Sequence, residues 1–430
     1  MALLRYVGGD ERTSRPIRGA HSLALCAPPE SRIVRVMRIF PTQRVLLVED
    51  VRADERAARR AGRIVAALGC GRPDVISREE ATRLWRDRPA KRPHPFHRRT
   101  GAFDYSAGWT LILDTYVDDD RPGDGVPRAT FRDGGAQMEG RGVCRSALEI
   151  HGAIGCYHRC AYCHCDPFFV VACDLESLAE RLPAYFARHP AQRLYKFDNL
   201  TDTICLEPEW GSSELLVPLF GATEDKYLLL YTKSDNVDHL LPLEHNGHTI
   251  VNWSMSTLTQ SRMIETGAPD TRERIAAMAK CRDAGYVVRV RISPVVPLER
   301  WRAEVVDLVE ELFAAAAPDS VTVDVVGWCV PEAFEEIVDV SLLDEAFRSH
   351  LRRTAGRPNP EGEKYLFDHE LRRTVLSHVV AEVKRRSPGT PVALCNETRR
   401  MWGDLGDLLG ATPENYVCCC GPDCAPGAGG

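Results

Sequence analysis

The chain has no apolar run that approaches the roughly 18 consecutive residues of a membrane-spanning helix. Its first residues, MALLRYVGGDERTSRPIRG, lack the apolar segment and cleavage site of a secretory leader. Positive charge is not in excess, because 55 Lys and Arg stand against 61 Asp and Glu and the net charge is -6. We therefore expect a cytoplasmic protein with no membrane partner. DNA is a disfavoured partner, although a local basic groove would be compatible with this charge.

Sixteen cysteines are many for a chain that we expect in a reducing compartment, where structural disulfides are rare. Nine of them fall in two groups, five between 156 and 173 and four between 418 and 424. Such clustering predicts metal binding or catalysis rather than chance burial.

The length of 430 residues suggests two to three structural units. Residues 1–117 are predicted to form a small mixed α/β domain, and 118–143, rich in Asp, Gly, Pro and Arg, a linker or mobile loop. Residues 144–390 alternate between strand and helix patterns, and 391–430 form a Cys-rich tail. The strands of the alternating part are expected at 193–198, 226–232, 249–256, 286–296 and 320–328, and its main helices at 175–189, 271–285 and 299–317. This alternation predicts an α/β fold whose parallel sheet is buried on both faces or closed as a barrel.

The segment GCYHRCAYCHC places Cys156, Cys160 and Cys163 at C-x3-C-x2-C spacing. Soft thiolates are suitable ligands for an iron-sulfur cluster. Three ligands from one loop leave a fourth iron open, so that a small molecule can chelate it. A zinc site is the alternative, but it needs four ligands, and Cys165 is a poorly spaced fourth. Purely structural cysteines are the third interpretation.

The position of this motif also favours a functional site. It follows the segment SALEIHGAI at 146–154, which we expect to be the first strand of the alternating part. Loops after such strands build active sites at the carboxyl ends of parallel strands. Tyr162, between the last two cysteines, is predicted to pack over the cluster or the adenine of a cofactor, unless it is an ordinary core aromatic.

C-x3-C-x2-C with an aromatic residue before the last Cys resembles the signature of the radical S-adenosylmethionine (SAM) superfamily. Three segments are more specifically similar to the spore photoproduct lyase family: KFDNLTD at 196–202, YTKSDNVDHLLPLEHNGHTIVNWSMST at 231–257 and ETGAPDTRERIAAMAKCRDAGYVVRVRISPVVP at 265–297. They cover the greater part of residues 150–300. The N-terminal unit matches that family more loosely, and the tail only faintly.

This resemblance implies a partial (β/α)6 radical SAM barrel with a 4Fe-4S cluster that S-adenosyl-L-methionine chelates through its amino and carboxylate groups. An electron from a flavodoxin- or ferredoxin-type donor would then cleave SAM, usually to methionine and a 5'-deoxyadenosyl radical.

The same resemblance assigns cofactor-binding roles to residues at strand ends. It implies that Lys233 meets the SAM carboxylate and that Ser254 and Ser256 bind the methionine moiety or the ribose. Asp198 and Asn199 are candidates to touch SAM or substrate. The plainer alternatives are a surface lysine, strand-end caps and a turn, respectively.

The chain departs from the lyase pattern in two places. The lyases carry a hydrogen-donating cysteine where this chain has Leu200 and Thr201, and Cys205 lies four or five residues later. They also place tyrosines after the cluster loop, where this chain offers two phenylalanines (Phe168 and Phe169) and Cys173. Repair of a thymine-dimer lesion in DNA is therefore our alternative hypothesis rather than the leading one.

The tail carries Cys418, Cys419, Cys420 and Cys424 at what we expect to be a flexible chain end, whereas Cys395 is expected to be a separate core cysteine. Three interpretations remain open: a second metal or cluster, capture of a thiophilic substrate, or redox-active or inert thiols. The tail is similar to the C-terminal arsenite motif of radical SAM enzymes that make arsinothricin.

That similarity implies that the tail thiols act in catalysis. They would hold a small thiophilic substrate such as trivalent arsenic while SAM donates a 3-amino-3-carboxypropyl group. The leading hypothesis is therefore a transferase, with a carbon-carbon lyase second and a non-enzymatic, zinc-stabilised binding protein third.

Overall fold

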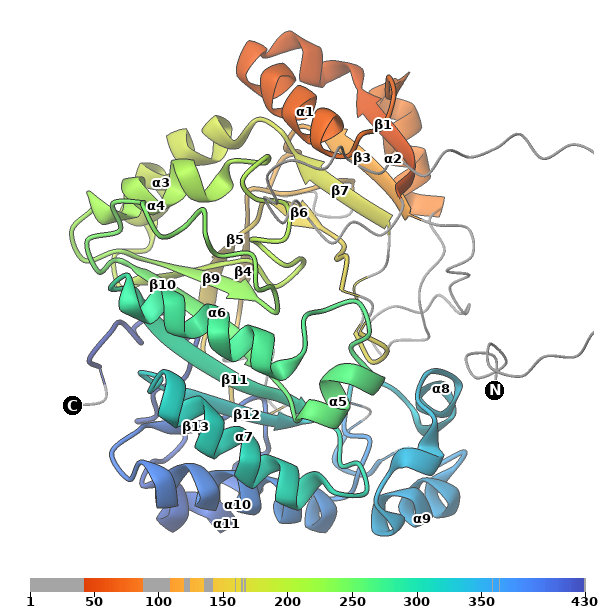
Figure 1. The fold of residues 1–430 in the computed structure, drawn as a ribbon, viewed down its shortest axis with the longest axis vertical. Coiled ribbons are helices and arrows are strands. Elements are labelled where there is room, and N and C mark those ends of the chain that lie inside the picture. Colours follow the sequence, from red (N-terminus) through yellow and green to blue (C-terminus); the bar gives the residue numbers. More distant parts are fainter. Residues whose placement is uncertain are drawn as a thin grey trace, which may run out of the picture.

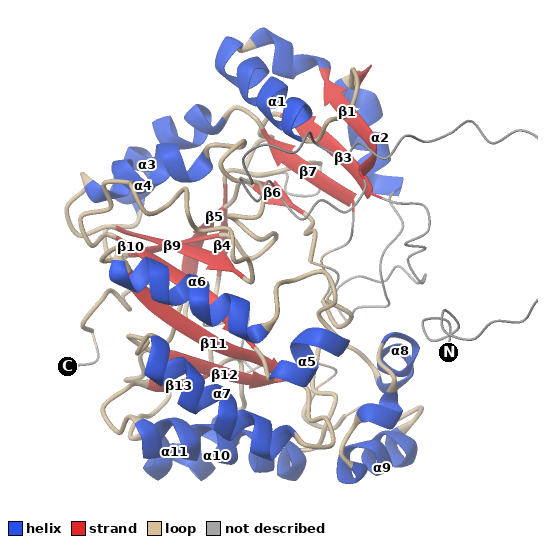
Figure 2. Ribbon diagram, in the orientation of Figure 1, coloured by secondary structure: helices blue, strands red, loops and turns tan. Residues whose placement is uncertain are grey.

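The computed structural model describes residues 42–87, 109–119, 124–134 and 142–428, apart from 159, 164, 166, 167, 358 and 363. These residues form two sheets with helices packed against them (Figures 1 and 2). None of the helices in these ranges is long and apolar enough to cross a membrane. The segment ESRIVRVMRIF at 30–40 has the pattern of a strand, but it lies outside the described residues.

The smaller sheet has the strand order β2-β1-β3-β7-β6. Its strands are β1 (Thr42–Val48), β2 (Asp74–Ile76), β3 (Trp109–Asp114), β6 (Ala153–Ile154) and β7 (Phe168–Ala172), and only β6 is antiparallel to its neighbour. Between its strands lie a 3-10 helix, η1 (Glu49–Ala53), and the helices α1 (Glu55–Ala67) and α2 (Arg78–Asp87). Because β6 and β7 flank the cysteine motif, this sheet joins the N-terminal residues to the motif.

The larger sheet has the order β13-β12-β11-β10-β9-β8-β5-β4. Its strands are β4 (Ala129–Arg132), β5 (Ala147–Ile150), β8 (Leu194–Phe197), β9 (Tyr227–Thr232), β10 (Thr249–Met255), β11 (Val287–Val295), β12 (Val321–Val325) and β13 (Val392–Leu394). All neighbouring pairs are parallel except β4 with β5. The stretch expected to be a linker or mobile loop therefore contributes an edge strand.

Helices connect the parallel strands as the sequence pattern predicts. They are α3 (Leu175–Arg188), α4 (Ser212–Gly221), α5 (Leu258–Met263), α6 (Thr271–Asp283), α7 (Trp301–Ala315), α8 (Pro331–Ile337), α9 (Glu345–Thr354), α10 (His369–Arg386) and α11 (Arg399–Leu409), with a 3-10 helix, η4 (Val340–Leu342). Local chemistry sets several of their starts: Asp270 and Glu273 form a capping box at α6, and Ser77 accepts a hydrogen bond from the Glu80 amide at α2. The expected α/β fold with parallel strands is confirmed.

The two faces of the larger sheet differ in chemistry. Helices α4, α6 and α10 pack on one face, as Figure 1 shows. Charged side chains within the sheet form ion pairs: buried Lys196 lies 3.3 Å from Glu149, and half-buried Arg291 lies 3.6 Å from Asp324. Buried charges need partners of this kind. Two of these residues, Arg291 and Asp324, also line the cavity of the candidate active site.

Candidate active site

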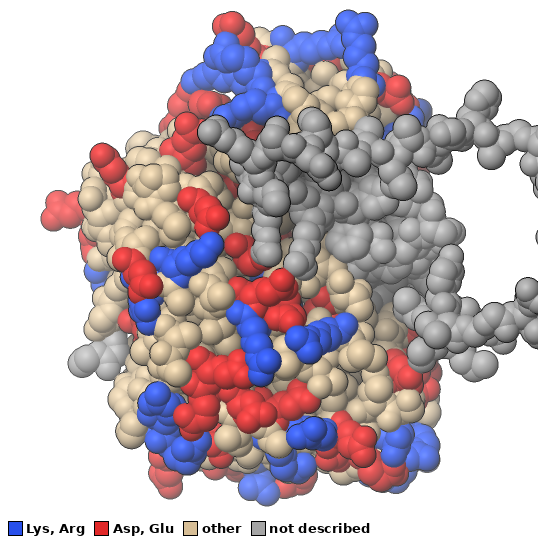
Figure 3. Space-filling view, viewed as in Figure 1, with Lys and Arg blue, Asp and Glu red and all other residues tan. Residues whose placement is uncertain are grey.

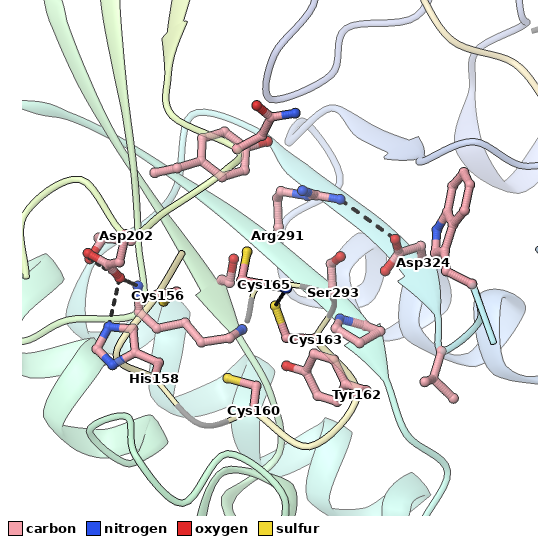
Figure 4. A pocket seen from close by; sticks show the side chains of 18 of the residues that line it. Cys156, His158, Cys160, Tyr162, Cys163, Cys165, Asp202, Arg291, Ser293 and Asp324 are labelled. Atoms are coloured by element: carbon pink, nitrogen blue, oxygen red, sulfur yellow. Dashed lines mark hydrogen bonds and ion pairs between the residues drawn. The ribbon is translucent and has the colours of Figure 1, made fainter. Parts of the chain in front are cut away.

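A cavity of about 240 Å³ lies where the cysteine loop meets the carboxyl ends of strands β8 to β12 (Figure 4). Parallel strands bring their carboxyl ends to one edge of the sheet, where loops from distant parts of the chain can meet. The lining residues are Cys156, His158, Cys160, Tyr162, Cys163, Cys165, Asp198, Asn199, Thr201, Asp202, Tyr231, Thr232, Lys233, Ser254, Arg291, Ser293, Pro294, Asp324, Val325, Val326, Gly327 and Trp328.

The three motif cysteines all face this cavity (Figure 4). The Cys163 amide donates to the Cys160 carbonyl at 3.0 Å, and the Ala161 amide donates to the Ile264 carbonyl at 2.8 Å, which tethers the loop to the end of α5. Burial raises the pKa of the Cys160 thiol to about 12 and that of Cys156 well above its ordinary value. A bound cationic centre would reverse this effect, because it stabilises thiolates.

A 4Fe-4S cluster and a single zinc ion require different arrangements of their ligands. In the described part of the chain, no three or more His, Cys, Asp or Glu side chains converge where one metal ion would sit. A mononuclear zinc site needs such convergence. A 4Fe-4S cluster binds each thiolate through a different iron, so its ligands surround a space rather than a point. Three thiols around one cavity fit a cluster.

His158 and Asp202 hold the cysteine loop against strand β9. The His158 Nε2 atom lies 2.8 Å from Asp202 Oδ2, and the Lys233 amide and the Thr232 hydroxyl donate to the same carboxylate. Burial opposes ionisation of Asp202, but His158 and these donors prevail and hold its pKa below the ordinary value. Neither residue was predicted from the sequence to belong to the site, although His158 stands inside the motif.

A buried carboxylate, Glu265, organises the other side of the loop. It lies 3.7 Å from Lys233 Nζ and 2.6 Å from Arg274 Nη2, and it accepts hydrogen bonds from Tyr162 and Ser256. Burial opposes ionisation of Glu265, yet Lys233 and Arg274 lower its pKa to about 2. Glu265 and Arg274 were not predicted from the sequence as site residues, because only the fold brings them to Lys233.

Of the six residues predicted to bind the cofactor, five line the cavity: Tyr162, Lys233, Ser254, Asp198 and Asn199. The exception is Ser256, which is buried outside the lining and hydrogen-bonded to Glu265 at 3.1 Å.

Asp198 is fully buried, and much of its hydrogen-bonding capacity is used within the protein. Its carboxylate accepts from the amides of Gly152 and Leu200 and contacts His151 Nδ1 at 2.7 Å. By contrast, Asn199 Oδ1 is buried without a hydrogen-bond partner.

Two thiols lie near the lyase-type donor position, but only one of them lines the cavity. Cys205 is buried outside the cavity lining, and its thiol donates to the Asp202 carbonyl at 3.1 Å. Cys165 does line the cavity, and its thiol donates to the Leu200 carbonyl at 3.5 Å. Cys165, which the sequence suggested only as a poorly spaced zinc ligand, therefore lies beside Leu200, where the lyases carry their hydrogen-donating cysteine. Cys173 is buried in the core behind it.

The cysteine tail is not a flexible chain end, so that expectation is wrong. Cys418, Cys419 and Cys424 are buried, and the Pro422 carbonyl accepts hydrogen bonds from the amides of Arg193 and Leu194 at the start of β8. The expectation that Cys395 stands apart is also wrong. Its Sγ atom accepts a hydrogen bond from Arg291 at 3.3 Å, and Cys144 and Cys420 lie close enough to influence its pKa.

Known proteins resemble both the sequence and the fold. Residues 145–337 match the family model for spore photoproduct lyase. The resemblance of the cysteine motif and the three strand-end segments to the spore photoproduct lyase family is therefore confirmed. Two curated spore photoproduct lyases, from Geobacillus sp. (strain Y412MC61) and Bacillus subtilis (strain 168), are each 26% identical to this chain, over 167 and 228 residues. These alignments cover 37% and 51% of this chain.

The sequence matches cover only part of these relatives. The chain spans 49% of the Geobacillus protein and 62% of the Bacillus subtilis protein. Solved spore photoproduct lyases match over more of their length. A variant with bound AdoMet and dinucleoside spore photoproduct has a TM-score of 0.59 at 17% identity, covering 83% of this chain and 98% of that one. A lyase complexed with dinucleoside spore photoproduct has a TM-score of 0.57 at 17% identity, covering 82% and 98%.

Proposed function

We propose that this chain is a radical SAM enzyme that reductively cleaves S-adenosyl-L-methionine at a 4Fe-4S cluster held by Cys156, Cys160 and Cys163. One observation carries the proposal: these three thiols surround the same cavity that Lys233 enters from strand β9. Residues 145–337, which match the lyase family, include all four of these side chains. We also infer that strands β5 and β8 to β12 form the partial (β/α)6 barrel expected of such an enzyme.

The chain's own residues bind and orient the cofactor in this proposal. When bound and reduced, the cluster supplies the electron that breaks a carbon-sulfur bond of SAM. Lys233 offers a positive charge to the SAM carboxylate, and Glu265 keeps that ammonium group in place. Ser254 and Asn199 offer hydrogen bonds at the neighbouring strand ends. A flavodoxin- or ferredoxin-type protein would deliver the electron.

Lesion repair is the substrate hypothesis that the comparisons support best. The similar proteins are spore photoproduct lyases, and one solved relative holds a dinucleoside spore photoproduct. The chain would then act as a carbon-carbon lyase on a thymine-dimer lesion in DNA. Cys165, beside the Leu200 carbonyl, would have to replace the missing donor thiol. On the face drawn in Figure 3, acidic and basic side chains are interspersed, so DNA would have to bind through local contacts.

A thiophilic substrate is the second candidate, and the position of the tail favours it. Cys419 contacts Tyr231, a residue of the cavity lining, so the tail thiols lie next to the proposed SAM site. Trivalent arsenic binds two or three thiolates, and SAM would donate a 3-amino-3-carboxypropyl group to it. Cys418, Cys419, Cys420 and Cys424 would be the residues that hold the substrate.

Product analysis distinguishes these candidates. The protein, reconstituted with iron and sulfide without oxygen, is reduced with dithionite and mixed with SAM. Formation of 5'-deoxyadenosine or methylthioadenosine identifies the bond that breaks, and intact SAM would refute the proposed function. Repair of an oligonucleotide that carries spore photoproduct supports the lyase. Arsenite binding that is lost when Cys418, Cys419 and Cys420 are replaced by Ser supports the thiophilic substrate.

A further inference from the structure

Two oppositely charged side chains face each other on one wall of the cavity without closing a hydrogen bond. Arg291 lies on β11, Asp324 lies on the neighbouring strand β12, and both line the cavity. Arg291 Nη2 and Asp324 Oδ2 are 3.6 Å apart, which is too long for a hydrogen bond. Figure 4 draws this contact as a dashed line, on the side of the cavity away from Asp202. Arg291 and Asp324 thus form an open pair.

Two arginine–carboxylate pairs deeper in the protein are closed by comparison. Arg274 Nη2 lies 2.6 Å from Glu265 Oε2, and Arg372 Nε lies 2.8 Å from Glu397 Oε1. These four side chains are at most 3% exposed, whereas both members of the open pair are 18% exposed. Charges in an interior close on each other because their desolvation is costly unless hydrogen bonds compensate it. An open pair at a cavity wall therefore leaves hydrogen-bonding capacity for a third group.

Two atoms of the open pair carry this unused capacity. Arg291 Nη2 donates to Cys395 Sγ at 3.3 Å, but Arg291 Nε is buried with no hydrogen-bond partner among the described residues. Asp324 Oδ1 is likewise buried without a partner in that part of the chain. Buried polar atoms in proteins are nearly always hydrogen-bonded. The open pair therefore lacks one acceptor for Arg291 and one donor for Asp324.

The charges of the open pair select the kind of ligand that can supply both groups. A carboxylate or phosphate would be attracted by Arg291 but repelled by Asp324, and an ammonium group would meet the reverse. A neutral group with an acceptor next to a donor satisfies both side chains at once. The edge of a cyclic imide has this pattern, because its N–H stands between two carbonyl groups. Proteins read the edges of nucleobases through such patterns of donors and acceptors.

Trp328 adds an aromatic ring to the same wall. It follows β12, lines the cavity and has a left-handed backbone conformation, with a φ of 62°. This conformation is rare for a bulky side chain. The Trp328 amide donates to the Lys364 carbonyl at 2.7 Å, and a Cβ atom on Gly327 would lie only 2.3 Å from the same carbonyl oxygen. Close packing on Lys364 therefore holds the backbone in a conformation that places the indole at the cavity.

We propose that Arg291 and Asp324 bind a carbonyl group and the N–H group of a neutral cyclic imide, the class to which the thymine ring belongs, and that Trp328 covers the face of that ring. Arg291 donates to the carbonyl oxygen, and Asp324 accepts from the N–H. The proposal rests on the proposed function, because the ring must lie beside SAM in the same cavity. It deepens the lesion-repair hypothesis, since trivalent arsenic held by thiols needs neither an imide contact nor an aromatic face.

Thymidine and N3-methylthymidine are matched probes for the Asp324 contact. The methyl group replaces the hydrogen of the imide N–H and leaves both carbonyl groups in place. Full-length, reconstituted protein is loaded with SAM but not reduced, and equilibrium dialysis gives the dissociation constant of each nucleoside. The wild type should bind thymidine about tenfold more tightly, because N3-methylthymidine cannot donate a hydrogen bond to the carboxylate.

Three variants assign this preference to individual side chains. Asp324→Ala should abolish it, and the ratio of the two dissociation constants in one preparation does not depend on how much of that protein is folded. Arg291→Met removes a contact with a carbonyl group that both probes carry, so it should weaken both and keep the preference. Asp225→Asn is the control, because this exposed carboxylate pairs with Arg193 outside the cavity lining and should change neither constant.

The role of Trp328 has its own measurement. Stacking of a base on an aromatic side chain contributes enough that Trp328→Leu should weaken the binding of both nucleosides about fivefold or more. The affinity for SAM, measured by dialysis of the same variant, should stay within about twofold of the wild type. Loss of SAM affinity with unchanged nucleoside binding would assign the indole to the cofactor and overturn its place in the imide subsite.

The outcomes separate the subsite from the proposed function. Equal binding of the two nucleosides by the wild type, an unchanged preference in Asp324→Ala, or no binding of thymidine would overturn the imide subsite. A parallel sample, reduced with dithionite, shows whether SAM is cleaved. If SAM is cleaved but the wild type does not prefer thymidine, the subsite alone is wrong. If SAM stays intact while the preference is present, the proposed function is wrong and the imide contact stands.

Discussion

The ammonium nitrogen of Lys233 lies 3.7 Å from the carboxylate of Glu265. The same carboxylate pairs with Arg274 at 2.6 Å, so that one negative charge stands between two positive ones. The group as a whole therefore carries a net positive charge beside the cavity. An anion bound near Lys233 would balance that charge, which is what a SAM carboxylate would do.

Replacement of Lys233 by Met should weaken SAM binding. A charge-assisted hydrogen bond contributes about 1.5–3 kcal/mol, so the dissociation constant should rise about tenfold or more. Isothermal titration of anaerobic, reconstituted protein with SAM measures this change. Lys280→Met is the matched control, because Lys280 is exposed, pairs with Asp238 and lies outside the cavity lining. If the wild type, Lys233→Met and Lys280→Met bind SAM with equal affinity, Lys233 is not part of the cofactor site.

Replacement of Glu265 by Gln should destabilise the protein at neutral pH. The change leaves buried Arg274 and half-buried Lys233 without their counter-ion, and such a loss costs about 3–5 kcal/mol. Urea unfolding at pH 7 gives the difference. Asp238→Asn, which removes an exposed ion pair with Lys280, should cost less than about 1 kcal/mol.

The stability that Glu265 contributes should also depend on pH. Its folded pKa of about 2 lies below its ordinary value of 4.5, so the contribution is complete above pH 4.5. It should disappear as the pH falls through about 2. In the Gln variant this part of the acid sensitivity should be missing. Parallel slopes of unfolding free energy against pH between 5 and 3 in the two proteins would show that Glu265 is not held as a carboxylate.

The three motif cysteines should be required for iron and sulfide. A protein with Cys156, Cys160 and Cys163 replaced by Ala should retain no brown colour after reconstitution. Alanine has no thiolate, and an iron-sulfur cluster needs thiolate ligands. Iron and acid-labile sulfide assays measure the loss. Cys70→Ala changes a half-buried thiol outside the cavity and serves as the control. Iron and sulfide that remain in the triple variant would refute the cluster assignment.

Removal of the tail from residue 416 onward should destabilise the fold. Tyr416, Cys419 and Cys424 are buried, and burial of a large side chain such as that of Tyr416 contributes about 1.5–3 kcal/mol. The truncation also removes the carbonyl that pairs with the start of β8. Thermal unfolding followed by circular dichroism should show a clear fall in Tm. Removal of residues 427–430 alone should have little effect, since Gly427 and Ala428 are exposed.

Short-range patterns in the sequence were enough to predict the parallel α/β fold. The strand at 227–232 is a continuous run of Leu, Tyr and Thr, and the strand at 287–295 has Val or Ile at most positions. The helix at 271–283 begins at a capping box that involves only neighbouring residues. The cysteine motif and Lys233 were also predictable, because each belongs to a short segment with a recognisable spacing. Both lie at strand ends, which parallel topology brings together.

Tertiary structure alone decided which distant groups meet. Ser256 was expected at the cavity, but its neighbour Glu265 holds it outside the lining, since a buried carboxylate needs donors. Arg274 and Asp202 were not predictable, because their partners lie on other elements. The tail looked flexible in the sequence, since four thiols and several small residues show no periodicity. Burial against strands β8, β11 and β12 places Cys419 on Tyr231, and those strands are more than 90 residues away along the chain.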